Sequence, residues 1–333
     1  MPLKNKIIYK ILTKSDIMPN IMPDWEKIRF KENFVERYSQ LTDFDRFKEY
    51  SLSFLQRCIR VNTLKISVDK LKKRIENNWN LTPISWCSEG FSINHKESER
   101  RDIGNLMEHS LGYIYVQESA SMIPPIVLAP KEEDIVLDMC ASPGSKTTQT
   151  AQYMNNKGLI IANDYTIERI KPLVLNLQRC GVLNTVTTLM HGHWFRNAGI
   201  KFDKILVDAP CSGTGTIRKS LKTLLIWNPN MVRRLSGIQK QLIETAFGIL
   251  KEGGTLVYST CSVEPEENEE VVDFLLKKHG NAKLEEIKLN IKRSPAILEF
   301  ENKKYSEEVK KCLRIWPQDN DSEGFFVVKI KKE

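Results

Sequence analysis

Short apolar runs alternate with longer amphipathic stretches over residues 130–280. Five of the runs have the length of buried strands, at residues 135–139, 159–164, 185–190, 204–210 and 255–261. The amphipathic stretches have helical spacing, at residues 145–155, 166–179, 231–250 and 265–279. Strands and helices that alternate in this way predict an α/β fold with a doubly wound parallel sheet covered by helices on both faces. A late apolar run at 324–330 predicts one more strand of that sheet, whereas 281–320 has no regular pattern.

Residues 1–125 have a different pattern, with dense mixed charge and shorter apolar runs. Helical spacing is found around 25–57 and 67–77, and strand candidates lie at 60–64 and 113–117. We therefore expect three parts, which are an N-terminal helical extension over residues 1–57, a smaller α/β subdomain over 58–125 and the large α/β domain over 126–333.

The composition is ordinary for a soluble globular protein, with 41% hydrophobic and 28% charged residues. No apolar run approaches the roughly 18–20 residues that a membrane-spanning helix needs. The first 28 residues are interrupted by lysines and contain no Arg, which disfavours a signal or transit peptide. These features predict a cytoplasmic protein. The net charge of +8 suits a polyanionic partner such as a nucleic acid, although many basic proteins bind none.

The seven cysteines show neither a disulfide framework nor a zinc site. Their number is odd, none forms a C-x-x-C pair, and no Cys/His ladder has metal-ligand spacing. We expect no metal, and we expect most of these thiols to be buried in the core.

The loop after the first predicted strand, residues 138–147, has the features of a cofactor site. Ligands of open α/β sheets bind beyond the carboxyl ends of the strands, and Pro143 with Gly144 permits a tight turn there. The spacing matches neither a dinucleotide nor a P-loop motif. A nucleoside-type cofactor is favoured, with a purely structural turn as the alternative. Asp164, at the end of the second strand, is placed to bind ribose hydroxyls or to cap the next helix.

Two further strand ends each present a cysteine, Cys211 in DAPCSGTGT and Cys261 in YSTCS. A single cysteine is usually an inert core thiol, but two of them beside a cofactor loop favour chemistry. Asp208, three residues before Cys211, either contacts a substrate or caps its own loop. Lys146 is a candidate cation for raising the thiolate fraction of a cysteine.

At these residues the chain resembles the Nol/Nop/Sun family of RNA 5-methylcytosine methyltransferases, over roughly residues 50–330. The resemblance rests on several motifs, which are CIRVNTLK (58–65), YVQESASM (115–122), DMCASPGSKT (138–147), DAPCSGTGT (208–216), YSTCSVEPEENE (258–269) and RIWP with EGFF (314–326). It implies a class I methyltransferase domain, Rossmann-like, preceded by an RNA-binding subdomain formed in part by 58–125.

The resemblance also implies roles for individual residues. S-adenosylmethionine would be bound by Cys140, Ala141, Ser142, Pro143, Gly144, Ser145, Lys146, Asp164, Arg169 and Asp208. Cys261 would be the nucleophile, and Cys211 would assist resolution of the covalent intermediate and release of the RNA. Lys146 and Asp208 would contact the cytosine.

The chemistry explains why a thiol is needed. Carbon 5 of cytosine is not nucleophilic enough to attack a methylsulfonium group, whereas addition of a thiolate to carbon 6 turns the ring into an enamine. Carbon 5 then takes the methyl group, and loss of its proton eliminates the thiol. Cysteine suits this task because it is strongly nucleophilic even when only partly ionised.

Three departures from the family pattern stand out. Ser142 and Ser145 stand where Ala and Gly are more usual, and both are small enough to preserve the loop. His191 falls where the family commonly has an Asp near the adenine. Gln318 replaces a His that often follows the Trp-Pro pair.

Other functions fit less well. A DNA cytosine methyltransferase would carry a Glu-Asn-Val motif, and an amino-group methyltransferase would carry an Asn/Asp-Pro-Pro-aromatic motif at 208–211; neither is present. A non-catalytic RNA-binding or ribosome-assembly protein on the same fold is the remaining alternative. We expect a monomer that acts on tRNA, with ribosomal RNA as the second candidate substrate.

Overall fold

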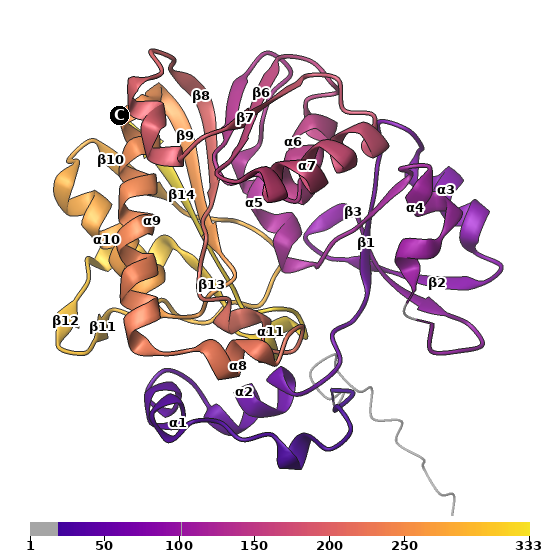
Figure 1. The fold of residues 1–333 in the computed structure, drawn as a ribbon, viewed down its shortest axis with the longest axis horizontal. Helices are drawn as coiled ribbons and strands as arrows, with labels where there is room; N and C mark the ends of the chain where they lie inside the picture. The colour runs from indigo at the N-terminus through magenta and orange to yellow at the C-terminus, as the bar shows by residue number, and fades with distance from the viewer. Residues whose placement is uncertain (1–18, 101) are drawn as a thin grey trace, which may run out of the picture.

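The computed structural model describes residues 19–100 and 102–333, which form two main sheets and a pair of N-terminal helices (Figure 1). The larger sheet has eight strands in the order β10-β14-β9-β8-β5-β6-β7, and β13 pairs with β14. Its strands are β5 (Ile135–Asp138), β6 (Leu159–Asp164), β7 (Thr185–Leu189), β8 (Phe202–Asp208), β9 (Leu250–Thr260), β10 (Ala282–Glu285), β13 (Leu313–Ile315) and β14 (Phe325–Lys332).

Five strands of this sheet, β5 to β9, run parallel, and helices cover both faces. The helices are α5 (Ile123–Leu128), α6 (Ser145–Tyr153), α7 (Ile167–Cys180), α9 (Pro229–Ile249) and α10 (Glu269–Lys278). Successive side chains of a strand point to opposite faces. Leu256 and Tyr258 of β9 accordingly pack with α9 and α10, whereas Val257 packs with α5 and α6. The predicted doubly wound α/β fold is confirmed.

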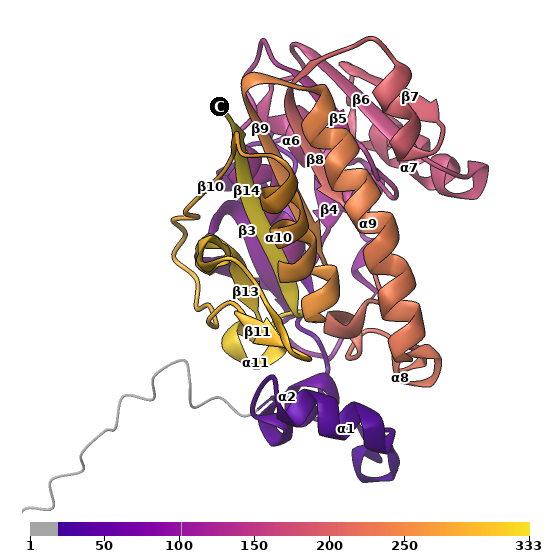
Figure 2. The ribbon, with the colours of Figure 1, turned by 90° about the vertical axis from the view of Figure 1, so that its left-hand side faces the viewer.

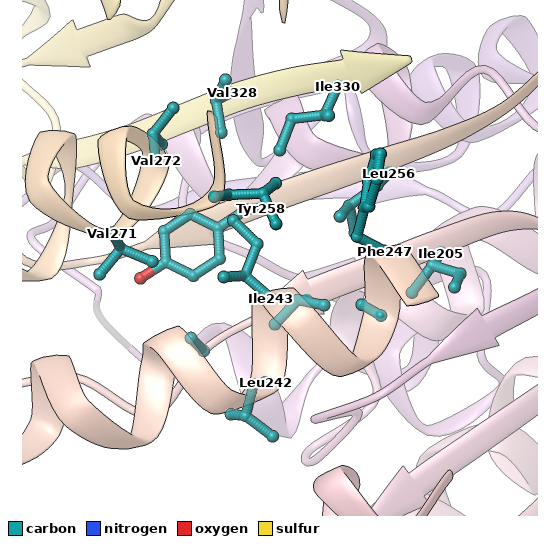
Figure 3. Packing of buried hydrophobic residues seen from close by; sticks show 14 of the residues in the cluster. Ile205, Leu242, Ile243, Phe247, Leu256, Tyr258, Val271, Val272, Val328 and Ile330 are labelled. Atoms are coloured by element: carbon teal, nitrogen blue, oxygen red, sulfur yellow. The ribbon is translucent and has the colours of Figure 1, made fainter. Parts of the chain in front are cut away.

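Figure 3 shows the core on the α9 and α10 face. Tyr258 and Leu256 of β9 lie over Ile243 and Phe247 of α9, and Val271 of α10 closes the cluster. All of these side chains are at most 1% exposed. The Tyr258 hydroxyl donates to the carbonyl of Glu267 at 2.6 Å, so the core also fixes the chain that follows Cys261.

The antiparallel part of the large sheet is formed by the C-terminal segment. β14 lies between β9 and β10 and is antiparallel to both. The irregular segment 281–320 contains β10, β13, the small hairpin β11 (Glu299–Phe300) with β12 (Lys303–Lys304), and α11 (Pro317–Asn320). The predicted late strand at 324–330 is therefore present as β14.

The smaller sheet has the order β2-β3-β1-β4 and is antiparallel throughout. Its strands are β1 (Cys58–Val61), β2 (Trp79–Ile84), β3 (Cys87–His95) and β4 (Ile114–Val116), accompanied by α3 (Val68–Ile75) and α4 (Met107–Ser110). Candidate strands at 60–64 and 113–117 correspond to β1 and β4, whereas the β2–β3 hairpin was not predicted.

The N-terminal helices α1 (Glu32–Ser39) and α2 (Phe44–Ser51) lie against the end of the large domain (Figure 2). Phe34, Tyr38 and Phe47 form one aromatic cluster with Trp227 and Trp316. The first 18 residues of the predicted extension lie outside the described residues. Within the described part of the chain, no helix has the length and apolar character needed to cross a membrane.

Candidate active site

Four parallel strands bring the predicted site residues to one edge of the sheet. β5, β6 and β8 end in Asp138, Asp164 and Asp208, and β9 ends at Thr260. The carboxyl ends of parallel strands meet at the same edge, which is where ligands of open α/β sheets bind. The loop of residues 139–144 and both cysteine loops begin there.

The loop of residues 139–144 is shaped by Gly144, whose φ of 102° suits glycine. A Cβ at this position would lie 3.0 Å from Cδ1 of Leu173. The Ser142 amide donates to Oδ2 of Asp164 at 3.0 Å, and Arg169 Nε donates to Oδ1 at 2.7 Å. The guanidinium of Arg169 also donates to the Ser142 carbonyl at 3.2 Å. Asp164 and Arg169 thus both hold the loop beside the end of β6.

Asp164 is not the cap of the following helix. The N-cap of α7 is Thr166. The Asp164 carboxylate accepts from Ser142, Tyr165 and Arg169, and an ionised carboxylate has about four acceptor positions. One acceptor position is therefore not used by the described residues.

The charges around the loop fit a cationic nucleoside cofactor. Asp138 is fully buried, and its Oδ2 accepts from Thr147 at 2.7 Å. Its Oδ1 has no partner among the described residues. Burial, with help from the nearby Asp208 and Asp164 carboxylates, raises the pKa of Asp138 to about 7. Three carboxyl groups therefore stand at adjacent strand ends, and those of Asp164 and Asp208 are already paired with Arg169 and Lys146.

The two predicted cysteines meet at the neighbouring strand ends. Asp208 of β8 is aligned with Ser259 of β9, so the loops that follow them run side by side. The sulfur atoms of Cys211 and Cys261 lie 3.3 Å apart. The hydrogen bond to Cys261, together with burial, raises the pKa of Cys211 well above its ordinary value. Cys211 therefore holds its proton more tightly than an ordinary thiol, and either sulfur can be the donor in the contact between them.

Lys146 supplies a fixed positive charge beside this pair. Its Nζ donates to Oδ2 of Asp208 at 2.7 Å and to Oγ of Ser121 at 2.9 Å. Burial opposes the charge, but the Asp208 carboxylate and the nearby Cys261 sulfur raise the pKa of Lys146 above its usual value.

Asp208 does not cap its own loop. Its Oδ1 accepts from Ser259 Oγ at 2.7 Å, and Oδ2 is bound to Lys146. Both partners come from other elements, so the carboxylate is held at the mouth of the site. It remains half-buried and accessible to a substrate.

The loop that follows Cys261 is clamped by buried acidic residues that sequence reasoning missed. Glu264 accepts from Arg37 Nε at 2.8 Å, from the Tyr38 hydroxyl at 2.7 Å and from Trp227 Nε1 at 2.7 Å. Further on, Glu269 forms a buried ion pair with Arg314. The only signal of this arrangement in the sequence is the acidic run after Cys261.

The Cys211 loop is held by Glu267, also missed at the level of sequence. This carboxyl group accepts from the Ser212 amide at 2.9 Å, from the Ser212 hydroxyl at 2.5 Å and from Gln239 at 3.1 Å. Burial raises the pKa of Glu267 to about 7. Glu267 thus connects the loop that carries Cys211 to the chain that follows Cys261.

Backbone packing also joins the loops to the EGFF segment. The Gly215 amide donates to the Cys261 carbonyl at 3.0 Å, and the Gly324 amide donates to the Gly215 carbonyl at 2.9 Å. A Cβ on Gly215 would lie 2.1 Å from the oxygen of Gly324. Only glycine fits at position 215.

The remaining predicted residues lie in the same region. Cys140 and Ala141 follow β5, and burial raises the pKa of Cys140 well above its ordinary value. His191 lies at the end of β7, with its ring centroid 6.2 Å from that of Tyr165 and 5.0 Å from that of Trp194.

The departure at Gln318 has a structural role. Its side-chain amide donates to the Thr42 hydroxyl at 2.9 Å and so ties α11 to the turn between α1 and α2. Gln318 therefore helps to hold the N-terminal helices against the large domain.

Sequence comparison relates most of the chain to one group of enzymes. The description "16S rRNA methyltransferase RsmB/F" matches residues 125–331, and "N-terminal domain of 16S rRNA methyltransferase RsmF" matches residues 30–119. The tRNA (cytosine(49)-C(5))-methyltransferase of Pyrococcus abyssi is 49% identical over 305 residues, which cover 91% of this chain and 97% of that protein. Ribosomal RNA small subunit methyltransferase F of Erwinia tasmaniensis is 40% identical over 319 residues, which cover 93% of this chain and 65% of that protein.

Solved structures show the same relationship. A methyltransferase homolog from Pyrococcus horikoshii has a TM-score of 0.82 and 37% identity, covering 94% of this chain and 100% of that chain. NSun6 from Pyrococcus horikoshii, solved with the S-adenosylmethionine analogue SFG, has a TM-score of 0.79 and 26% identity, covering 91% of this chain and 98% of that chain.

The family predicted from the motifs is confirmed by these matches. The two matched ranges include the carboxyl ends of the parallel strands, where the candidate site lies, and the smaller sheet. The chain belongs to the RsmB/F, or Nol/Nop/Sun, family of RNA cytosine-C5 methyltransferases, which take their methyl group from S-adenosylmethionine.

Proposed function

We propose that this chain methylates carbon 5 of a cytosine in tRNA and that Cys261 is the nucleophile. The observation that carries the proposal is the 3.3 Å contact between the sulfur atoms of Cys211 and Cys261, with the Lys146–Asp208 ion pair beside it. In this proposal Cys211 donates its S–H to Cys261, whose sulfur also lies near the ammonium group and is the one that acts as an anion.

The first step is addition of the Cys261 thiolate to carbon 6 of the cytosine. The sulfur–carbon bond forms as the carbon 5–carbon 6 π bond opens, and negative charge moves into the ring. Lys146 and Asp208 orient the base, and the Lys146 ammonium group stabilises this charge. Asp208 accepts a hydrogen bond from the exocyclic amine or from N3 once N3 carries a proton.

The second step makes carbon 5 the nucleophile. S-adenosylmethionine, when bound, supplies an electrophilic methyl group on its sulfonium sulfur. Residues 140–146 with Asp164, Arg169 and Asp208 would hold this cofactor.

The last step releases the product. Loss of the proton from carbon 5 to a base restores the double bond and expels Cys261 as a thiolate. Cys211 assists because its S–H bond to the departing sulfur stabilises the developing charge. Cys211 is also placed to keep Cys261 from adding again to the product.

Two observations support tRNA rather than ribosomal RNA. The tRNA enzyme of Pyrococcus abyssi has the higher identity and is matched over 97% of its length. The ribosomal RNA enzyme of Erwinia tasmaniensis is matched over 65% of its length. Ribosomal RNA remains the second candidate because both family descriptions name it.

The remaining expectations complete the proposal. Residues 58–125 form an RNA-binding subdomain, residues 1–57 an N-terminal extension and residues 126–333 the catalytic domain. The protein acts as a monomer. Thiol addition activates the ring, and the proposed steps involve no metal. The cytoplasmic location stays a prediction.

Bisulfite sequencing tests the function and the substrate together. Purified protein is incubated with S-adenosylmethionine and unmodified tRNA and ribosomal RNA transcripts, with a reaction lacking cofactor as the control. One protected cytosine in tRNA alone is the expected result. Protection in ribosomal RNA alone would replace the substrate, and protection in neither would overturn the proposal.

A further inference from the structure

The short helix α8 (Lys222–Ile226) exposes apolar side chains on its solvent face. Thr223, Leu224 and Trp227 are buried against the body of the protein. Lys222, Leu225 and Ile226 have the i, i+3, i+4 spacing of the opposite face. Leu225 is 76% exposed and Ile226 is 59% exposed, so both large side chains are presented to solvent.

The helix is anchored firmly despite its length. The indole nitrogen of Trp227 donates to Glu264 at 2.7 Å. Lys31 from the start of α1 donates to the Leu225 carbonyl at 3.0 Å and to the Trp227 carbonyl at 2.7 Å. The exposed face is therefore held in place rather than left to collapse onto the core.

This anchored face lies at the catalytic end of the molecule. α8 stands next to the start of α9, and β9 runs back antiparallel to α9 and ends at the catalytic edge (Figure 2). Trp227 is bonded to Glu264, only three residues after Cys261. A bound RNA whose cytosine reaches Cys261 thus passes close to α8.

The chain segment that contains α8 is basic, and acidic groups reach it only from other elements, among them Glu323 beside Lys219 at 3.7 Å and Glu301 beside Arg233 at 3.9 Å. Residues 209–243 contain six Lys or Arg and no Asp or Glu. Arg218 and Lys240 are engaged with Asp321 and Glu270. The other four basic residues are exposed, and they are Lys219, Lys222, Arg233 and Arg234. Within residues 19–100 and 102–333, neither Lys222 nor Arg234 forms an ion pair.

We propose that these four basic residues, with Leu225 and Ile226, form an RNA-docking surface, called here the α8 surface. Its basic groups neutralise backbone phosphates. Its two apolar side chains insert into the base stack beside the cytosine that leaves it. A base that enters a catalytic pocket must be extruded, and apolar wedges are a general means of opening a stack. A protein partner would offer acidic groups, whereas a stacked polyanion satisfies both features at once.

The inference rests on the proposed RNA substrate, and the wedge is tested by fluorescence. The probe is a tRNA transcript with 2-aminopurine next to the cytosine that the wild-type protein protects. Leu225→Ala/Ile226→Ala should lose most of the fluorescence rise on binding and about 10- to 100-fold of the single-turnover rate. Its Kd should change less than about 3-fold, because the phosphate contacts remain. Leu183→Ala/Val186→Ala, at exposed apolar positions near β7, is the matched control and should behave as wild type.

The basic groups are tested by the salt dependence of binding to an unmodified tRNA transcript. Lys222→Gln/Arg234→Gln should make the slope of log K against log salt less steep by about 1.5. Each phosphate contact contributes roughly 0.7–0.9 to the slope, and the variant removes two basic groups. Lys277→Gln/Lys278→Gln, at the far end of α10, should leave the slope unchanged. Binding and unstacking equal to the controls in both α8 variants would overturn the inference while leaving methylation intact. If the wild-type protein does not methylate RNA but Lys222→Gln/Arg234→Gln still lowers the salt slope, the proposed function is wrong and the α8 surface still binds RNA.

Discussion

The two loops that present the cysteines are held by different forces. The loop after Cys261 is fixed by buried charges, since Glu264 binds Arg37 and Glu269 binds Arg314. The loop that carries Cys211 is fixed by the hydroxyl and amide of Ser212, which donate to the single carboxyl group of Glu267. Breaking a buried ion pair costs far more than losing one neutral hydrogen bond. The support of the Cys261 loop is therefore mainly ionic, whereas the Cys211 loop is held by hydrogen bonds to Glu267 and by the backbone bond from Gly215 to the Cys261 carbonyl.

The same asymmetry holds for the sulfur atoms. Cys211 keeps its proton because its pKa is raised by the bond to Cys261 and by burial. Cys261 lies near Lys146. In the proposed mechanism Cys261 is the nucleophile and Cys211 is its proton-bearing partner, with their sulfur atoms 3.3 Å apart.

The largest expected effect comes from Cys261→Ala. Removing the nucleophile should reduce methyl transfer by at least about 10⁴-fold, because carbon 5 is then never activated. Transfer of labelled methyl groups from S-adenosylmethionine measures this loss, and equilibrium binding of RNA and cofactor serves as the folding control. Methylation at the normal rate would contradict the assignment.

The clamp on the Cys261 loop is tested by Arg37→Met. Glu264 and Glu266 would then be buried without their cation, and the free energy of unfolding should fall by about 3–5 kcal/mol. Urea denaturation provides the measurement. Glu301→Gln, which removes the exposed partner of Arg37, should cost at most about 1 kcal/mol. Ser212→Ala in the other loop should cost about 1–2 kcal/mol. Equal losses in the free energy of unfolding for Arg37→Met and Ser212→Ala would contradict the proposed difference between the two loops.

The difference between the sulfur atoms is tested by Lys146→Met. Without the ammonium group, the Cys261 thiolate loses its neighbouring charge, and methyl transfer should fall by about 10²–10³-fold. A second measurement is independent of turnover: alkylation by iodoacetamide, located by mass spectrometry. Cys261 should react faster than Cys211 in the wild-type protein, and the variant should slow Cys261 at neutral pH. Unchanged alkylation would place the activating charge elsewhere.

The smallest effect is a change in pH dependence with Glu267→Gln. The folded protein holds the Glu267 proton with a pKa of about 7, above the ordinary value of 4.5. Between these values the folded state binds more protons than the unfolded state, so stability falls as pH rises from about 4.5 to 7. The variant lacks this group, and its Tm should fall less between pH 5 and pH 8. Asp138 contributes in the same direction in both proteins, and identical Tm profiles would refute the role of Glu267.

Local periodicity predicted the parallel core because each strand and helix carries its own pattern. β5 and α6, for example, begin at Ile135 and Ser145 as predicted. The segment 281–320 was not placed because β10 and β13 are short and pair with the distant β14. The β2–β3 hairpin was missed because the alternation of apolar and polar residues in β2 lasts only four residues before Pro83, and a proline argues against a strand.

The groups at the strand ends were predicted, whereas their supports were not. Cys211, Cys261, Lys146 and Asp208 belong to motifs, and the structure brings them together. Arg37 and Glu267 carry no local signal, because buried charged residues are rare and resemble surface residues in sequence. The acidic run after Cys261 matches the first turn of an exposed helix equally well, and only tertiary contacts reveal its burial.

The most direct test of the central claim is a denaturing gel of protein incubated with labelled tRNA and S-adenosylmethionine. Cys211→Ala should accumulate a covalent protein–RNA adduct, because addition proceeds and release is slowed. The adduct should be absent from Cys211→Ala/Cys261→Ala. Loss of the adduct in this double variant identifies Cys261 as the bonded residue, whereas an adduct that persists without Cys261 would contradict the account.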